Sequence, residues 1–135
     1  MGNIQWDTAW NIGHPEIDEQ HQRWVALFNE LESAFLSKKT IDMTVVQKNI
    51  FKKILDYTRY HFASEEKIMH DAAYPNMATH WRLHKEFDQI VYEKYRDFES
   101  GELILNSELL ALIKNWLLRH IQVEDQKFGH YLRER

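Results

Sequence analysis

The chain has 135 residues, a length that favours one domain with a single hydrophobic core. Its 17 basic and 21 acidic side chains give a net charge of −4, which argues against nucleic-acid binding because such proteins present a basic face. The chain has no cysteine, which excludes disulfides, iron–sulfur clusters, thiolate zinc sites and cysteine catalysis. It has eight histidines, and histidines without cysteines favour a metal site built from nitrogen and oxygen ligands.

Four segments have apolar residues at helical spacing, and few glycines or prolines interrupt them. Asp18 is the expected N-cap of the first helix. Because the connections are short, we expect neighbouring helices to be antiparallel. The sequence therefore predicts an all-α protein, a single-domain up-down antiparallel four-helix bundle. The helices are expected over about residues 18–37, 42–70, 76–99 and 107–131.

An N-terminal arm, residues 1–15, lacks this periodicity but contains Trp6 and Trp10. Tryptophan has a large apolar surface, so we expect the arm to pack along the bundle. No apolar run approaches the roughly 18 residues that span a bilayer, and no basic-then-apolar leader opens the chain. We therefore expect a cytoplasmic protein that binds neither a membrane nor a nucleic acid.

Polar residues interrupt the apolar face of every predicted helix. A buried polar group is costly unless it is satisfied, and one buried histidine usually forms a hydrogen bond within the core. Five histidines spread over four helices cannot easily satisfy one another, whereas a shared metal can. The interrupting residues are His21, His61, Glu65, His80, His84 and His120.

Two spacings support a metal site. His61 and Glu65 are one helical turn apart, as are His80 and His84, so each pair lies within about 40° around its helix axis. Each pair can therefore bind one centre from a single helix face. Apolar neighbours such as Phe62 indicate that these faces are not solvated.

The fourth helix offers two carboxylates near His120. Glu124 shares the face of His120 in a regular helix, whereas Asp125 lies about 140° away and needs a helix that ends, tightens or bulges. Spacing alone leaves both residues open. The histidines and carboxylates together are too many for one tetrahedral zinc, and they suit two six-coordinate ions with bridging carboxylates. Imidazole and carboxylate without thiolate indicate iron or manganese more than zinc.

The order of these residues resembles the hemerythrins, in particular their prokaryotic branch, the bacteriohemerythrins. The resemblance extends from about Trp6 to Leu132. The ligand pattern is His21, His61-x3-Glu65, His80-x3-His84 and His120-x4-Asp125. The flanking matches are Ile17-Asp18-Glu19-Gln20-His21, His61-Phe62, Glu65-Glu66, Met69, Tyr74-Pro75, Trp116-Leu117 and His120-Ile121.

The resemblance implies two iron ions that share an oxo or hydroxo bridge. It selects Asp125 over Glu124, and it implies a local distortion of the helix between His120 and Asp125. It assigns three histidines to one iron, two to the other and two carboxylates to both: His80, His84 and His120; His21 and His61; Glu65 and Asp125.

The resemblance further implies reversible dioxygen binding at the open position of the two-histidine iron, for storage, transport or delivery rather than catalysis. An enzyme that consumes oxygen is a candidate recipient, and the oligomeric state is left open. Reversible binding needs a pocket without water. The residues expected to line it are Trp24, Phe28, Phe62, Leu117 and Ile121.

Two other functions use this kind of site. An oxygen or redox sensor of a signalling protein ranks second, because no output module accompanies the site in this chain. A diiron oxidase or peroxidase ranks third, because ferritin-like oxidases prefer carboxylate-rich sites with Glu-x-x-His.

Other polar residues are expected at the surface. Glu66, Asp88 and Glu124 could orient the imidazoles, but we expect them to be surface charges. His14, His70 and His130 occupy no ligand position and are expected to be solvated.

Overall fold

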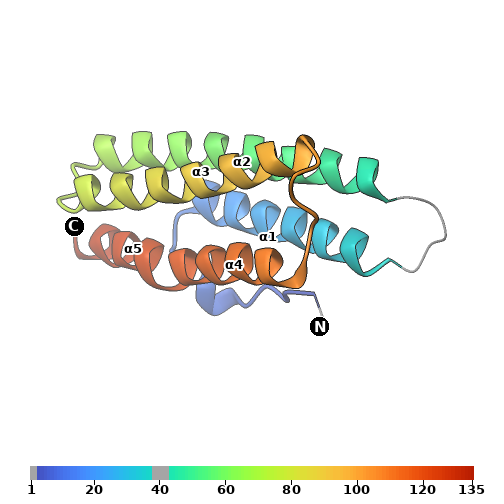
Figure 1. Cartoon of the computed structure of the whole chain (residues 1–135). Helices are drawn as coiled ribbons and strands as arrows, with labels where there is room; N and C mark the ends of the chain where they lie inside the picture. The colour runs from blue at the N-terminus through green and yellow to red at the C-terminus, as the bar shows by residue number, and fades with distance from the viewer. Residues whose placement is uncertain (1–2, 38–42) are drawn as a thin grey trace.

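The computed structural model describes residues 3–37 and 43–135. Four long helical runs lie side by side and alternate in direction (Figure 1). The described residues contain no strand, so the predicted all-α, up-down four-helix bundle is confirmed. The helices are α1 (Pro15–Leu36), α2 (Thr44–Asp71), α3 (Met77–Glu99), α4 (Ser107–Arg119), the π-helix η2 (His120–Glu124) and α5 (Asp125–Glu134).

The first helix begins at Pro15, earlier than the predicted start near residue 18. Proline suits this position because its fixed φ matches the helix and its missing N–H has no helical partner there. The cap is His14, whose Nδ1 accepts the backbone N–H of Ile17 at 3.3 Å. Asp18 was therefore the wrong cap. It lies in the first turn and accepts the backbone N–H of Gly13 at 3.2 Å.

The other helices lie close to their predicted ranges. The predicted start of the second helix, Asp42, lies outside the described residues. The fourth run extends to Glu134, past the predicted end near residue 131, and consists of α4, η2 and α5 in succession. The π-helix η2 occupies the place where the resemblance implied a distortion.

The arm before α1 packs along the bundle as predicted. The backbone of Ile4 forms two hydrogen bonds with the side chain of Asn29, one donated by each residue, at 2.9 and 3.0 Å. Trp6 and Trp10 meet edge to face, with ring centroids 5.3 Å apart, and are half-buried against the bundle. Trp10 belongs to the short 3-10 helix η1 (Thr8–Trp10).

Contacts with α1 and α5 hold the end of the arm. The Asp18 carboxylate accepts the backbone N–H of Ile12 at 2.7 Å, and the Gln126 side chain donates to the carbonyl of Trp10 at 2.8 Å. Gly129 of α5 packs against the same segment. A Cβ atom at this position would lie 2.6 Å from the carbonyl oxygen of Ile12, so the contact requires glycine.

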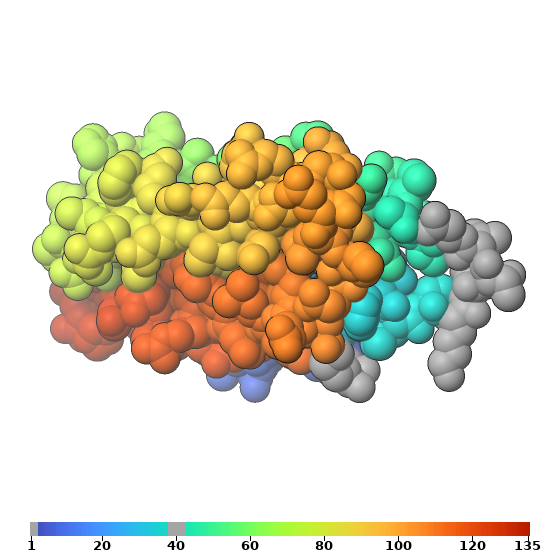
Figure 2. All heavy atoms as spheres, viewed as in Figure 1, coloured from blue at the N-terminus to red at the C-terminus, as the bar shows by residue number. Residues whose placement is uncertain are grey.

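Two clusters of apolar side chains fill the bundle. On the face drawn in Figure 2, side chains of α3 and α4 meet along the molecule. None of the described helices is both long enough and apolar enough to cross a bilayer. The large core includes Trp24, Phe28, Leu31, Phe51, Ile54, Phe62, Phe87, Val91, Leu117 and Ile121. The small core consists of Ile12, Ile17, Met69, Ala72, Tyr74 and Phe128.

Candidate metal centre

A layer of buried polar side chains separates the large core from the small core along every helical run. Each of these side chains belongs to a residue that is no more than 3% exposed. The structure thus brings all seven predicted ligands together from the four runs. This polar layer consists of His21 from α1, His61 and Glu65 from α2, His80 and His84 from α3, His120 from η2 and Asp125 from α5.

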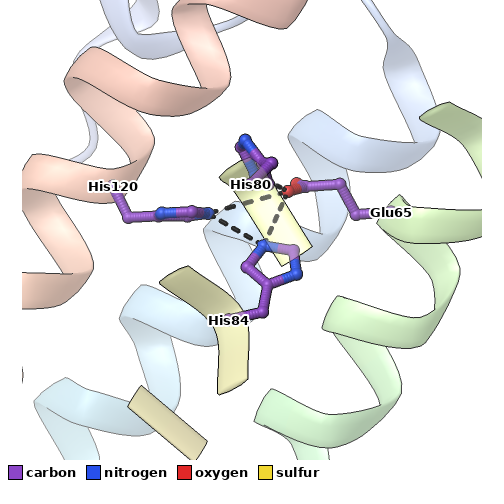
Figure 3. Close-up of side chains that lie close together, drawn as sticks. All are labelled: Glu65, His80, His84 and His120. Carbon is purple, nitrogen blue, oxygen red and sulfur yellow. Dashed lines mark hydrogen bonds and ion pairs between the residues drawn. The ribbon is translucent and has the colours of Figure 1, made fainter. Parts of the chain in front are cut away.

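The polar layer contains two groups of four residues. Within each group, the potential ligand atoms lie within 4.8 Å of one another. Figure 3 shows the three-histidine group, in which the rings of His80, His84 and His120 converge on Glu65. The Nε2 atoms of these rings lie 2.7, 3.2 and 3.7 Å from Glu65 Oε1. The two-histidine group contains His21, His61, Glu65 and Asp125.

Both carboxylates divide their oxygens between the two groups. Glu65 Oε1 faces the three-histidine group, while Oε2 lies 3.3 Å from His61 Nε2 and 3.4 Å from His21 Nε2. Asp125 Oδ1 lies 2.9 Å from His80 Nε2, and Oδ2 lies 2.8 Å from His21 Nε2. Each carboxylate therefore offers one oxygen to each group, which is the arrangement of a bridge between two ions.

The π-helix brings Asp125 into the polar layer. The backbone N–H of Asp125 donates to the carbonyl of His120, across five residues rather than the four of an α-helix. This wider turn places both side chains on one face. Glu124, which spacing left as an alternative, is half-buried and instead lies 3.3 Å from the ammonium of Lys127.

Several buried atoms of the polar layer have no hydrogen-bond partner among the described residues. They are Nε2 of His21 and His61, Oε2 of Glu65 and both carboxylate oxygens of Asp125, together with Nδ1 of His21. His21 Nε2 and Asp125 Oδ2 are only 2.8 Å apart, yet they lack hydrogen-bond geometry. Their lone pairs are therefore available to a shared cation, which would satisfy atoms that are otherwise costly to bury. The residues fit a pair of metal ions.

Protonated imidazoles balance the two buried carboxylates when no cation does so. Burial lowers the pKa of His21, but the carboxylates of Asp125 and Glu65 outweigh it and raise this pKa to about 9. Burial also lowers the pKa of His80, but the same two carboxylates outweigh it and raise this pKa to about 10. Burial favours a higher pKa for Glu65, but the surrounding imidazoles hold it well below its usual value. Metal binding would replace these protons with a cation.

Two outer partners orient imidazoles of the polar layer. The Nδ1–H of His61 donates to Gln20 Oε1 at 2.8 Å, and the Nδ1–H of His84 donates to Glu66 Oε2 at 2.8 Å. Each bond leaves the Nε2 lone pair directed at the polar layer. The expectation that Glu66 is a surface charge was wrong, because its side chain is only 19% exposed and faces an imidazole. Sequence reasoning missed Gln20, although its place beside His21 on the apolar face of α1 was a usable signal.

The remaining polar candidates lie at the surface, with one exception. Asp88 pairs with Arg59 at 2.8 Å, as expected of a surface charge. The side chains of His70 and His130 are 79% and 68% exposed, so their predicted solvation is confirmed. His14 is half-buried and caps α1, so its prediction was wrong.

Apolar side chains cover the polar layer on the side of the large core. The ring of Trp24 lies 5.0 Å from that of His61 and 6.5 Å from that of His21, which places it against the two-histidine group. Phe62 stacks on His84 with centroids 3.8 Å apart, so its closest ring contact is with the three-histidine group. All five predicted pocket residues are buried in the large core: Trp24, Phe28, Phe62, Leu117 and Ile121.

Comparison with known proteins identifies the family. Residues 13–132 match the family model described as the hemerythrin HHE cation binding domain. The chain belongs to the hemerythrin family. The resemblance read from the sequence is thus confirmed at the level of the family, and a hemerythrin-family polar layer offers histidine and carboxylate ligands to metal ions.

The relatives of this hemerythrin-family chain match it over most of its length. The bacteriohemerythrin of Stenotrophomonas maltophilia is 35% identical over 129 residues, which are 96% of this chain and 81% of the relative. The bacteriohemerythrin of Methylococcus capsulatus is 26% identical over 132 residues, or 96% of each chain. A crystal structure of wild-type hemerythrin superposes with a TM-score of 0.85 at 23% identity, covering 95% of this chain and 96% of that one, which shows the shared fold.

Proposed function

We propose that this hemerythrin-family chain binds dioxygen reversibly at a pair of iron ions and so stores, transports or delivers it. The division of the Glu65 and Asp125 oxygens between two histidine groups carries the proposal, because one ion has no use for two such bridges. The donor set contains imidazole and carboxylate without thiolate, which suits iron. Membership of the hemerythrin family supports the same conclusion.

The ligands would be unequally shared. One ion would be enclosed by three imidazoles and the bridges, whereas the other would keep a position open for dioxygen. When bound and reduced, two ferrous ions supply two electrons to dioxygen, one from each ion, and recover them on release. The assignment is His80, His84 and His120 for one ion, His21 and His61 for the other, and Glu65 and Asp125 for both, with a solvent-derived bridge.

Apolar side chains would keep water away from the open position. Trp24 packs against both imidazoles of the two-histidine group, and Leu117 and Ile121 have no exposed surface. Water that reaches such a site would promote loss of reduced oxygen and leave the ions oxidised. By excluding water, these apolar side chains favour reversible binding of dioxygen over its consumption in a reaction. We expect the protein to act in the cytoplasm, with an oxygen-consuming enzyme as the recipient.

Anaerobic spectroscopy tests the proposal. The iron-loaded protein is reduced without air, its visible spectrum is recorded, air is admitted, and dioxygen is then removed. We expect a visible absorption band that appears with air and disappears on removal of dioxygen. Metal analysis should find about two irons per chain. An irreversible change to the ferric form would favour the sensor or oxidase alternatives.

A matched pair of carboxylate variants tests the bridge. Asp125→Asn removes a bridging charge from the polar layer, whereas Glu124→Gln removes the adjacent charge that pairs with Lys127. We expect Asp125→Asn to lower the iron content and abolish the reversible band. Glu124→Gln should keep both. Equal behaviour of the two variants would contradict a bridging role for Asp125.

A further inference from the structure

One imidazole of each histidine group donates its outer N–H to a side chain, and the two acceptors differ in charge. His61 donates its outer N–H to the amide oxygen of Gln20, which is neutral, and His84 donates its outer N–H to the carboxylate of Glu66, which is an anion. Both hydrogen bonds are 2.8 Å long. The two hydrogen bonds are therefore equal in length, but their acceptors differ in charge.

The structure holds the neutral partner firmly in place. Gln20 is only 5% exposed, and its amide Nε2 donates to the hydroxyl of Ser64 at 3.0 Å. The amide oxygen thus stays directed at His61. The two-histidine group is backed by a fixed dipole rather than by a charge.

Glu66 directs its charge at His84 rather than at a nearby cation. It lines a surface cavity of about 290 Å³ together with Arg59, Lys85 and Asp88. Arg59 is paired with Asp88 at 2.8 Å, and the ammonium of Lys85 lies over the Trp81 ring at 5.3 Å. Both cations therefore have other partners, and the short contact of Glu66 is with the imidazole.

We infer that Glu66 is a positioning residue that makes the three-histidine group the stronger donor to its ion, while Gln20 keeps the two-histidine group weaker. A carboxylate that accepts the outer N–H increases the electron density at the opposite nitrogen, and a neutral amide does so less. The stronger donor binds its ion more tightly and stabilises the ferric state. The ion at the open position stays the easier of the two to reduce. This inference rests on the proposed function.

Metal binding by the metal-free full chain is the first test. Co²⁺ is a suitable probe because its visible absorption depends on coordination number, so the two binding steps can be assigned to the two groups. We expect Glu66→Gln to weaken the step of the three-histidine group by about tenfold or more, the range known for outer partners of metal ligands. Gln20→Glu should strengthen the step of the two-histidine group.

Control variants separate charge from position. Asp88→Asn removes a charge from the same cavity without touching His84, and it should change either step by less than about twofold because exposed pairs contribute little. Glu66→Ala removes the hydrogen bond as well as the charge, so it should weaken the step further than Glu66→Gln. Circular dichroism should be the same for the Glu66 and Asp88 variants, because both side chains reach the edge of the bundle.

The reduction potentials of the iron-loaded protein provide a readout that a merely structural role would not move in this pattern. Glu66→Gln should raise the potential of the three-histidine ion, and Gln20→Glu should lower that of the other ion. The double variant should shrink or reverse the difference. If the wild-type chain binds fewer than two Co²⁺ ions, the proposed diiron function fails. If it binds two but Glu66→Gln behaves like Asp88→Asn, the present inference alone is overturned.

Discussion

The large core and the polar layer occupy the same helices but are stabilised in different ways. In the large core, side chains such as Phe51, Phe87 and Val91 are buried, and burial of a large apolar side chain contributes about 1.5–3 kcal/mol without any ligand. In the polar layer, buried atoms of His21, His61 and the carboxylates have no hydrogen-bond partner among the described residues. Burial in the large core is therefore favourable without any ligand, whereas the unpartnered atoms of the polar layer would gain partners from bound cations.

The largest effect of a single substitution on stability is expected in the large core. Phe51 is fully buried, and its ring lies 5.7 Å from Tyr95 and 6.0 Å from Phe98. Phe51→Ala should lower the free energy of unfolding by about 3–5 kcal/mol, measured by urea denaturation of the iron-loaded protein. The folded fraction should keep its iron content. Loss of iron from folded Phe51→Ala would show that the two regions are not separable.

Removal of the metal should affect the polar layer selectively. An ion present at a hundredfold its dissociation constant stabilises the fold by about 2.7 kcal/mol, so chelation should cost about this much for each ion. Amide hydrogen exchange should accelerate around His61 and His84 more than around Phe51. A uniform acceleration along α2 would contradict the division into two regions.

The contact between the arm and α5 should give a smaller effect. Gly129→Ala places a Cβ atom 2.6 Å from the backbone carbonyl of Ile12, so the arm or α5 must shift. We expect a loss of about 1–3 kcal/mol in thermal unfolding. The exposed neighbour variant His130→Ala serves as the control and should stay within about 0.5 kcal/mol of the wild type.

The boundary between the two regions should control the rate of autoxidation. Ile121 is fully buried next to His120. Ile121→Ser would place a hydroxyl group between the large core and the polar layer. Spectroscopy of the oxygenated form should show oxidation about tenfold faster, equivalent to about 1.4 kcal/mol of activation free energy. Ile54→Ser makes the same change inside the large core and should leave the rate unchanged. If both variants oxidise faster to the same extent, the effect comes from lost stability rather than from water in the pocket.

Local spacing was sufficient to predict α2 and α3 with their ligand pairs. A side chain four residues from another lies on the same helix face, so His61 with Glu65 and His80 with His84 follow from periodicity alone. The two tryptophans of the arm also predicted that it packs against the bundle, although the arm has no helical periodicity. These features depend on one helix at a time or on burial, and both can be read from the sequence.

Features that depend on contacts between helices could not be read in this way. Glu66 was expected at the surface because its position on α2 alone does not reveal that His84 of α3 faces it. The cap of α1 was misassigned because both His14 and Asp18 are capable acceptors, and the path of the arm decides which N–H each one meets. Asp125 followed from the resemblance rather than from spacing, since a π-turn is a local departure from the regular periodicity that spacing assumes.

The π-turn also tells where the metal centre would tolerate the loss of a residue. A π-turn accommodates one more residue than the α-helical path beside it. Deletion of Val123 would place Asp125 four residues after His120, so one continuous α-helix from Ser107 onward would still hold both side chains on one face. Gly129 would likewise keep its facing toward the arm. Loss of one codon from the regular helix between Asp125 and Gly129 would instead rotate Gly129 by about 100° and separate it from the arm.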